Sequence, residues 1–117
     1  MKQVMKMGKY AGLLALALSL GACSGESAEM AANAHPGQST YNEACISCHN
    51  PGISGAPRLG DTDAWQARAA KGRQTLVNST INGLNSRPAK GMCWQCTDED
   101  LGDAVDNILE QSGVSAN

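Results

Sequence analysis

The clearest hydrophobic pattern in the chain lies near its C-terminus. Apolar residues recur there at i, i+3, i+4, i+7 and i+8, namely Leu101, Ala104, Val105, Ile108 and Leu109, and this spacing places them on one face of an α-helix. Thr97 is a suitable N-cap, and Gly113 is a suitable residue for the end of the helix. The pattern therefore predicts a helix between these two residues, with a solvated opposite face formed by Asp103, Asp106 and Glu110.

Capping residues, glycine stops and apolar spacing together predict three shorter helices upstream, over residues 41–48, 63–71 and 74–82. Thr40 and Glu43 have the spacing of a capping box for the first of them. The inward-facing positions of the other two are Trp65, Ala69, Leu76, Val77 and Ile81. Residues 50–60 are rich in glycine and proline, which predicts a loop. The expected fold class is all-α, with about four short helices.

The composition limits what these helices can bury by themselves. The chain has 117 residues, no Phe, and four aromatic residues, which are Tyr10, Tyr41, Trp65 and Trp94. A domain of this size usually needs disulfides, a metal or a cofactor in addition to its apolar side chains. A buried cofactor with a large apolar surface would give several short helices a body to pack on.

The central motif is Cys45-Ile46-Ser47-Cys48-His49, a C-x-x-C-H run. This pattern is typical of covalent attachment of a c-type haem. The thiols of Cys45 and Cys48 would add across the two vinyl groups of one porphyrin, and His49 would be the proximal iron ligand. The alternative is half of a zinc site or of a redox C-x-x-C site, which an exported chain makes less favourable.

The first 22 residues have the pattern of an export signal. Lys2, Lys6 and Lys9 precede an apolar stretch over residues 10–20, which is too short for a membrane-spanning helix. Residues 20–23, Leu-Gly-Ala-Cys, resemble the lipobox of bacterial lipoprotein signals, which implies cleavage before Cys23 and its lipidation. The alternative is an ordinary signal that leaves a free thiol at Cys23. The same resemblance to lipoprotein signals implies that Ser24, which follows Cys23, favours the outer membrane over the inner one.

Residues 23–38 are expected to be the lipidated cysteine and a flexible tether, followed by a domain over residues 39–117. His35, within this tether, is expected to be solvated rather than an iron ligand. From Cys23 onward the chain has six basic and eleven acidic residues, hence a net charge of −5. This charge argues against nucleic acid as a partner and favours a redox partner with a basic docking patch.

Cys93 and Cys96 form a second C-x-x-C pair. In an oxidising compartment two neighbouring thiols are expected to form a disulfide. Two alternatives remain at this point. The pair could join Cys45 and Cys48 in an all-thiolate zinc site, which His49 argues against. It could also be a catalytic dithiol, although no βαβ pattern surrounds it.

Taken together, these motifs resemble the class I cytochromes c, and among them the short bacterial cytochrome c5 type. The likeness covers residues 38–111. It includes C-x-x-C-H, Gly-Ala-Pro-Arg-Leu-Gly-Asp over residues 55–61 with Trp65 four positions later, Asn-Gly-Leu-Asn over residues 82–85, Pro-Ala-Lys-Gly over residues 88–91, and the second C-x-x-C.

The resemblance implies a small cytochrome c fold around one covalent haem c, with the first and last helices crossing. It also implies that the carbonyl of Pro57 accepts the proton of His49, that Trp65 packs near the haem propionates, and that Cys93 and Cys96 form a disulfide.

One position departs from the family pattern. The family has its distal Met ligand immediately before the Pro-x-Lys-Gly loop, and here that residue is Arg87. A guanidinium is a poor iron ligand because it stays protonated and offers no lone pair. Met92 could ligate instead, the sixth position could be open or water-bound, or Lys90 or Asn85 could occupy it.

These observations predict a membrane-anchored carrier on the periplasmic side of a bacterial membrane, which passes single electrons between periplasmic or membrane redox proteins as Fe(II) and Fe(III) interconvert. It would be a carrier rather than an enzyme with its own substrate. The alternative is a haem protein with an open or weakly held sixth site, which would act as a small-ligand sensor, a binder or a weak peroxidase.

Overall fold

The computed structural model describes residues 34–116. The predicted signal peptide, the predicted lipidation site Cys23 and the first part of the predicted tether lie outside these residues. Residues 34–116 contain five α-helices and two 3₁₀ helices and no β-strand. No helix within them is long and apolar enough to cross a membrane. The domain is therefore all-α, as predicted.

Helix α6 (Asp98–Gln111) contributes many of the buried residues of the core. The N-cap predicted at Thr97 is confirmed. Its hydroxyl oxygen accepts from the amide of Asp100, and the Asp100 carboxylate accepts from the amide of Thr97. The five apolar residues of the predicted face are all buried. This is the helix that the periodicity predicted most clearly, and α2 and α5 pack against it.

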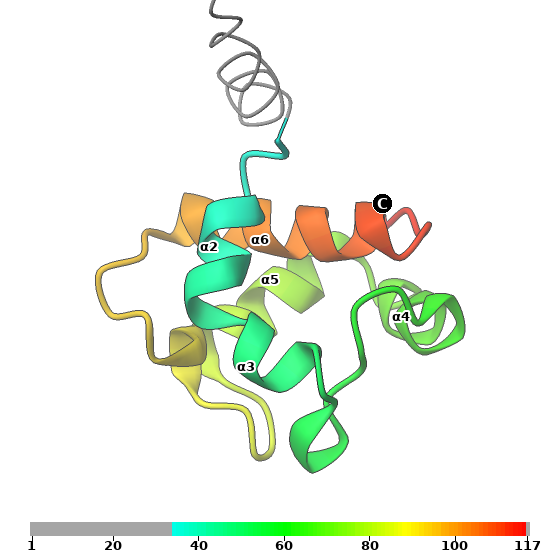
Figure 1. Cartoon of the computed structure of the whole chain (residues 1–117), viewed down its shortest axis with the longest axis horizontal. Coiled ribbons are helices and arrows are strands. Elements are labelled where there is room, and N and C mark those ends of the chain that lie inside the picture. Colours follow the sequence, from blue (N-terminus) through cyan, green and yellow to red (C-terminus); the bar gives the residue numbers. More distant parts are fainter. Residues whose placement is uncertain (1–33, 117) are drawn as a thin grey trace, which may run out of the picture. The chain divides into compact units, whose positions relative to one another are not determined.

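Helix α2 (Gln38–Ala44) crosses α6 (Figure 1). The expected start at Tyr41 is wrong, because the helix begins after Gly37, and Thr40 is buried inside it rather than capping it. The reason is tertiary. A Cβ atom on Gly37 would lie 1.9 Å from the carbonyl oxygen of Asp103, so only glycine lets the two backbones meet this closely.

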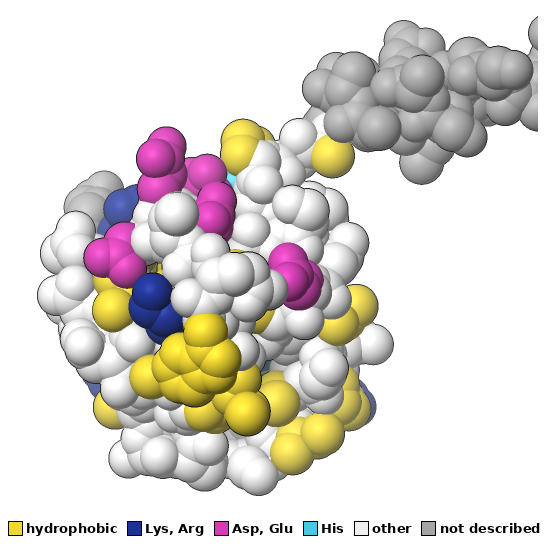
Figure 2. Space-filling model, turned by 90° about the vertical axis from the view of Figure 1, so that its left-hand side faces the viewer, with side chains coloured by type: hydrophobic (Ala, Val, Ile, Leu, Met, Phe, Trp, Pro, Cys, Tyr) yellow, Lys and Arg dark blue, Asp and Glu magenta, His cyan; other side chains and the backbone are white. Residues whose placement is uncertain are grey.

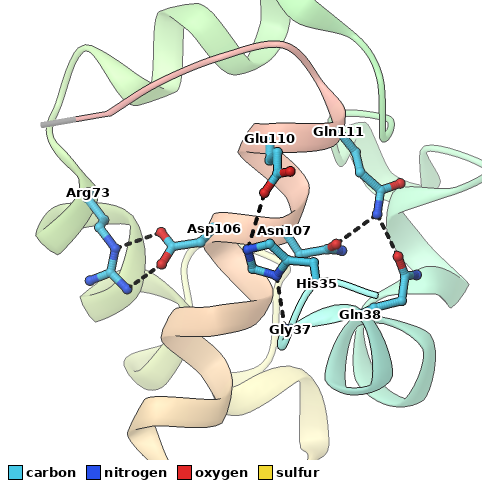
Figure 3. Close-up of polar contacts among 8 residues, drawn as sticks. All are labelled: His35, Gly37, Gln38, Arg73, Asp106, Asn107, Glu110 and Gln111. Carbon is cyan, nitrogen blue, oxygen red and sulfur yellow. Dashed lines mark hydrogen bonds and ion pairs between the residues drawn. The ribbon is translucent and has the colours of Figure 1, made fainter. Parts of the chain in front are cut away.

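Polar contacts fasten the start of α2 to α6 (Figure 3). The amide of Gly37 donates to Nδ1 of His35, and Nε2 of His35 lies 3.4 Å from the carboxylate of Glu110. The side-chain amide of Gln111 donates to that of Gln38 at 2.7 Å. Residues 34–38 thus belong to the folded unit, and the domain begins before the expected boundary at residue 39.

The acidic side of α6 is also less solvated than expected. Asp106 accepts two hydrogen bonds from the guanidinium of Arg73, at 2.6 and 2.8 Å (Figure 3). Arg73 is the first residue of α5 (Arg73–Asn82), so this bidentate pair joins the two helices. The sequence period of α6 separates apolar from polar residues, but it cannot show which polar residues meet a partner from another helix.

The remaining elements form the walls of a cavity. The expected helix over residues 41–48 is divided at Cys45 into α2 and α3 (Ile46–His49). The 3₁₀ helix η1 (Ile53–Gly55) lies in the predicted loop, and α4 (Thr62–Ala69) begins after Asp61, whose side chain accepts from the amide of Ala64. The 3₁₀ helix η2 (Ala89–Met92) contacts α5 and α2.

Candidate haem site

A cavity of about 820 Å³ lies between α2, α3, α4, α5, α6 and the segment before α6. Its apolar walls include Trp65, Leu76, Ala104, Val105 and Ile108. The volume is within the range of about 300–1,000 Å³ that is usual for ligand and cofactor sites. The helices therefore enclose a space that their own side chains do not fill, as the composition predicted.

The two cysteines of the C-x-x-C-H run both line this cavity. Cys45 is half-buried at the break between α2 and α3, whereas Cys48 is exposed. Burial raises the pKa of the Cys45 thiol to about 11, although the nearby charge of Arg87 acts in the opposite direction. Both thiols are unpaired within the described residues, so each has its sulfur available for a thioether bond.

His49 is buried and is held by one loop at two points. Its Nδ1 lies 2.8 Å from the carbonyl oxygen of Pro57, and its own carbonyl oxygen accepts from the amide of Leu59 at 2.8 Å. A carbonyl can only accept, so Nδ1 carries the proton and the lone pair of Nε2 remains for a metal. Burial lowers the pKa of this imidazole, and the charges of Arg87 and Arg68 lower it further.

Trp65 supports the same wall of the cavity. Its indole N–H donates to the carbonyl oxygen of Arg58 at 2.8 Å, and its ring centroid lies 5.5 Å from that of His49. The side chain is 4% exposed. Because Arg58 follows Pro57 directly, this hydrogen bond and that of His49 fix two consecutive carbonyl groups of the loop. One short loop thus orients both the histidine and the tryptophan.

Arg87, in the segment between α5 and η2, also lines the cavity. It ends a tight turn in which Leu84 and Arg87 exchange two backbone hydrogen bonds, of 3.1 and 2.9 Å. Its Nε atom is buried and has no hydrogen-bond partner within residues 34–116. Burial lowers the pKa of its guanidinium, the charge of Cys45 raises this pKa, and the charge of Arg68 lowers it.

The other residues considered for the sixth iron position are placed less favourably. Met92 lines the cavity but is 64% exposed. Lys90 lines the cavity, but its ammonium already donates to the carbonyl oxygen of Cys96 at 3.2 Å. Asn85 is exposed at the tip of the turn, with a left-handed φ of 53°.

The sulfur atoms of the second C-x-x-C pair, Cys93 and Cys96, lie next to each other, as a disulfide would require, and both residues are buried against Leu101. The potential metal ligands that lie within 4.8 Å of one another among the described residues are Glu43, Cys93 and Cys96. Cys45 and Cys48 are not part of that group, so the four cysteines do not form a single zinc cluster in this part of the chain.

Two contributors to the site were absent from the sequence-based prediction. Arg68 lines the cavity and is close enough to His49 to lower its pKa, and the backbone carbonyl of Arg58 orients Trp65. A signal for Arg68 was present, because it follows Trp65 by three positions and such residues share a helix face. The role of the Arg58 carbonyl had no such signal, because every residue has a backbone carbonyl whatever its side chain.

With this geometry in view, comparison with known proteins defines the class. Residues 32–108 match the family model described as "Cytochrome C oxidase, cbb3-type, subunit III". The chain belongs to this family, and it is a class I c-type cytochrome. Its cavity, paired thiols and buried imidazole fit the one covalently attached haem c that the family implies, whose iron supplies a one-electron Fe(II)/Fe(III) couple.

More particularly, the chain is similar to two kinds of small bacterial cytochrome. It is 41% identical to cytochrome c-555 of Chlorobaculum tepidum, over 68% of this chain and 78% of that protein. It is 39% identical to cytochrome c5 of Ectopseudomonas mendocina, over 55% of this chain and 76% of that protein. The resemblance to the cytochrome c5 type is thereby confirmed.

A solved structure has the same fold. It is a chain in the crystal structure of an electron transfer complex of nitrite reductase with cytochrome c. The match has a TM-score of 0.63 and 30% sequence identity, and it covers 66% of this chain and 94% of that chain. The predicted small cytochrome c fold is confirmed.

Proposed function

We propose that this cytochrome is a lipid-anchored carrier that passes single electrons between redox proteins on the periplasmic side of a bacterial membrane. The observation that carries the proposal is the placement of Cys45, Cys48 and a neutral, loop-held His49 on one cavity that is otherwise mostly apolar. Such a site holds an iron porphyrin by covalent bonds and one fixed axial ligand. In this proposal the chain does no organic chemistry of its own.

Charge and surface character support protein partners. From Cys23 onward the net charge is −5, which suits a redox partner with a basic docking patch. Figure 2 shows hydrophobic side chains gathered in a patch on one face. The exposed large hydrophobic residues of the described domain are Ile46, Ile53, Leu84, Met92 and Trp94. The similarity to a cytochrome c in complex with nitrite reductase supports a redox enzyme as one partner.

The lipid anchor is proposed from the Leu-Gly-Ala-Cys run at residues 20–23. Two or more acyl chains would make membrane attachment stable rather than reversible. Replacement of Cys23 by Ser should therefore move the haem protein from the membrane fraction to the soluble periplasmic fraction. A Cys23→Ser protein that stays in the membrane fraction would contradict the anchor and leave the electron carrier untouched.

The carrier itself is tested with the full chain, expressed together with haem-maturation machinery. The denatured protein should retain one covalent haem, and a reductive titration should consume one electron per chain. A double variant in which Cys45 and Cys48 are both Ala is the matched control and should lose covalent haem. Absence of covalent haem from the wild-type chain would sink the proposal.

The placement of Arg87 favours a second candidate, a haem protein whose sixth iron position is open to small ligands. Arg87 stands in the cavity at the family's Met position, and Met92 is largely exposed. The donors and steric access on the distal side decide whether a haem binds ligands or only transfers electrons. Rapid binding of carbon monoxide to the reduced protein would support this candidate, and no binding would exclude it.

A further inference from the structure

We infer that Arg87 makes the distal side of this cavity a binding site for small anions that can ligate ferric iron, such as azide, fluoride or cyanide. The inference rests on the haem attachment and the open sixth position proposed above, and it adds the chemical class of the ligand and the residue that selects it. Three features of the described residues carry it: the position of Arg87, its unpaired donor, and the charge of the cavity.

The turn before η2 fixes the backbone position of Arg87. Leu84 and Arg87 are joined by two backbone hydrogen bonds. A Cβ atom on Gly83 would lie 3.0 Å from the carbonyl oxygen of Arg87, so the turn is closely packed on its inner side as well. Because the backbone is held at both ends of the turn, the side chain of Arg87 reaches the cavity from a defined point.

The guanidinium has donor capacity that the protein leaves unused. Its Nε is buried and lacks a partner within residues 34–116, which is uncommon for a buried polar atom. Buried arginines in folded domains are normally paired with carboxylates or backbone carbonyls. An anion held in the cavity would satisfy this donor and would be stabilised by a charge-assisted hydrogen bond.

The charge of the cavity points the same way. The domain as a whole has an excess of acidic residues. Even so, four of the six basic side chains in residues 34–116 line the cavity, namely Arg68, Lys71, Arg87 and Lys90. Only one of the nine acidic side chains lines it, and that residue, Glu43, accepts a hydrogen bond from Gln95 on the outside of the domain. The haem propionates would neutralise only part of this positive charge.

Protein side chains offer little competition for the position. The backbone from Lys90 to Met92 has left-handed φ angles of 57°, 57° and 65°. A Cβ atom on Gly91 would lie 2.8 Å from the carbonyl oxygen of Ala44, so this segment is packed tightly against α2. Met92 belongs to this tightly packed segment, and 64% of it is exposed to solvent.

An anion that binds ferric iron in preference to ferrous iron would also change the carrier. By thermodynamic linkage it stabilises the oxidised state, and each tenfold preference lowers the midpoint potential by about 59 mV. The anion would thus hold the carrier oxidised. Arg87 would couple the local concentration of such an anion to electron flow.

The test is a titration of the ferric full-length holoprotein with sodium azide, followed by absorption. Arg87→Gln should weaken azide binding roughly tenfold to hundredfold, because a charge-assisted hydrogen bond is lost. Imidazole, a neutral ligand of ferric iron, should bind the two proteins with similar affinity. Glu99→Gln changes the net charge by one unit at an exposed position outside the cavity, and it should leave azide binding unchanged.

Two further variants sharpen the result. Arg87→Lys keeps the charge but loses the planar fork, and its azide affinity should lie between those of the wild type and Arg87→Gln. Arg87→Met restores the family's ligand and should abolish azide binding at moderate concentrations. Equal azide affinity in the wild type and Arg87→Gln would overturn the inference, because Arg87 would then serve another role, such as contact with a propionate.

The outcomes separate this inference from the functions on which it rests. Loss of covalent haem from the wild-type chain would defeat the electron carrier itself. A wild-type haem that binds neither azide nor imidazole would defeat the open sixth position and this inference but leave the carrier standing. A wild-type haem that binds both ligands, with no effect of Arg87→Gln, would defeat this inference alone.

Discussion

The two walls of the haem cavity are built in different ways. On the proximal wall, which carries His49 and Trp65, one loop holds both side chains. The carbonyl of Pro57 is hydrogen-bonded to His49, and the carbonyl of Arg58 accepts from Trp65. On the distal wall, a tight turn places one arginine in the cavity, and the segment that follows exposes Met92. The first wall is buried and cross-linked by hydrogen bonds, whereas the second depends on a single side chain.

This difference shows where the chemistry of such a domain can change without loss of the fold. A replacement of His49 or Trp65 that removes its N–H donor leaves the carbonyl of Pro57 or Arg58 without its partner, which is costly. A replacement at Arg87 alters what faces the iron, and the backbone hydrogen bonds of its turn are retained. Proximal changes should therefore affect haem retention and stability, and distal changes should affect ligand binding.

Removal of the proximal histidine should have the largest effect. His49→Ala should lower the yield of haem-loaded protein roughly tenfold or more, since loss of even an outer-shell partner of a metal ligand costs about 10–100-fold in affinity. His35→Ala is the control, because His35 contacts Glu110 away from the cavity. Haem staining of denatured protein on a gel measures both. Equal yields from the two variants would contradict the role of His49.

The helix crossing that supports the proximal wall should come next. Gly37→Ala should destabilise the haem-loaded domain by about 3 kcal/mol, because the added methyl group overlaps the backbone of α6 at Asp103. Gly102→Ala is the matched control on α6. There the new Cβ would lie 3.1 Å from a nitrogen of the flexible Arg73 side chain, and the change should stay within about 1 kcal/mol. Urea denaturation compares the two.

The two tryptophans provide a direct contrast between the walls. Trp65→Phe removes the donor to the carbonyl of Arg58, and should lower the free energy of unfolding by about 2 kcal/mol. Trp94 follows the distal segment and is 66% exposed, so Trp94→Phe should change it by less than about 0.5 kcal/mol. Similar losses in thermal or urea unfolding would show that the walls do not differ in this way.

Met92 should give the smallest effect. Met92→Ala should change the free energy of unfolding by less than about 0.5 kcal/mol, because the side chain is 64% exposed. The ferric absorption spectrum should also stay the same. A clear spectral change in this variant would mean that Met92 reaches the iron, and the contrast between the walls would then have to be revised.

Local patterns predicted the elements that local interactions stabilise. Helix α6 was predicted from its apolar period and from the cap at Thr97, and each of these signals is formed by residues close together in the sequence. The start of α2 did not follow. Thr40 and Glu43 have capping-box spacing, but the close approach of Gly37 to Asp103 extends the helix upstream, and that contact joins residues far apart in the sequence.

The site shows the same division. The C-x-x-C-H motif and the departure at Arg87 were visible in the sequence. The left-handed φ angles of Lys90 and Met92 and the packing of Gly91 against Ala44 were not, because non-glycine residues seldom adopt them and no local pattern marks them. The sequence therefore showed that the usual sixth ligand is replaced, but the geometry of the distal wall came only from the tertiary structure.

The most direct test of the contrast between the walls is the near-infrared spectrum of the ferric holoprotein, where a haem ligated by His and Met shows a weak sulfur-to-iron band. With Arg87 in the cavity and Met92 exposed, the wild-type protein should lack this band, and Arg87→Met should gain it. A wild-type protein that shows the band and loses it in Met92→Ala would contradict the account.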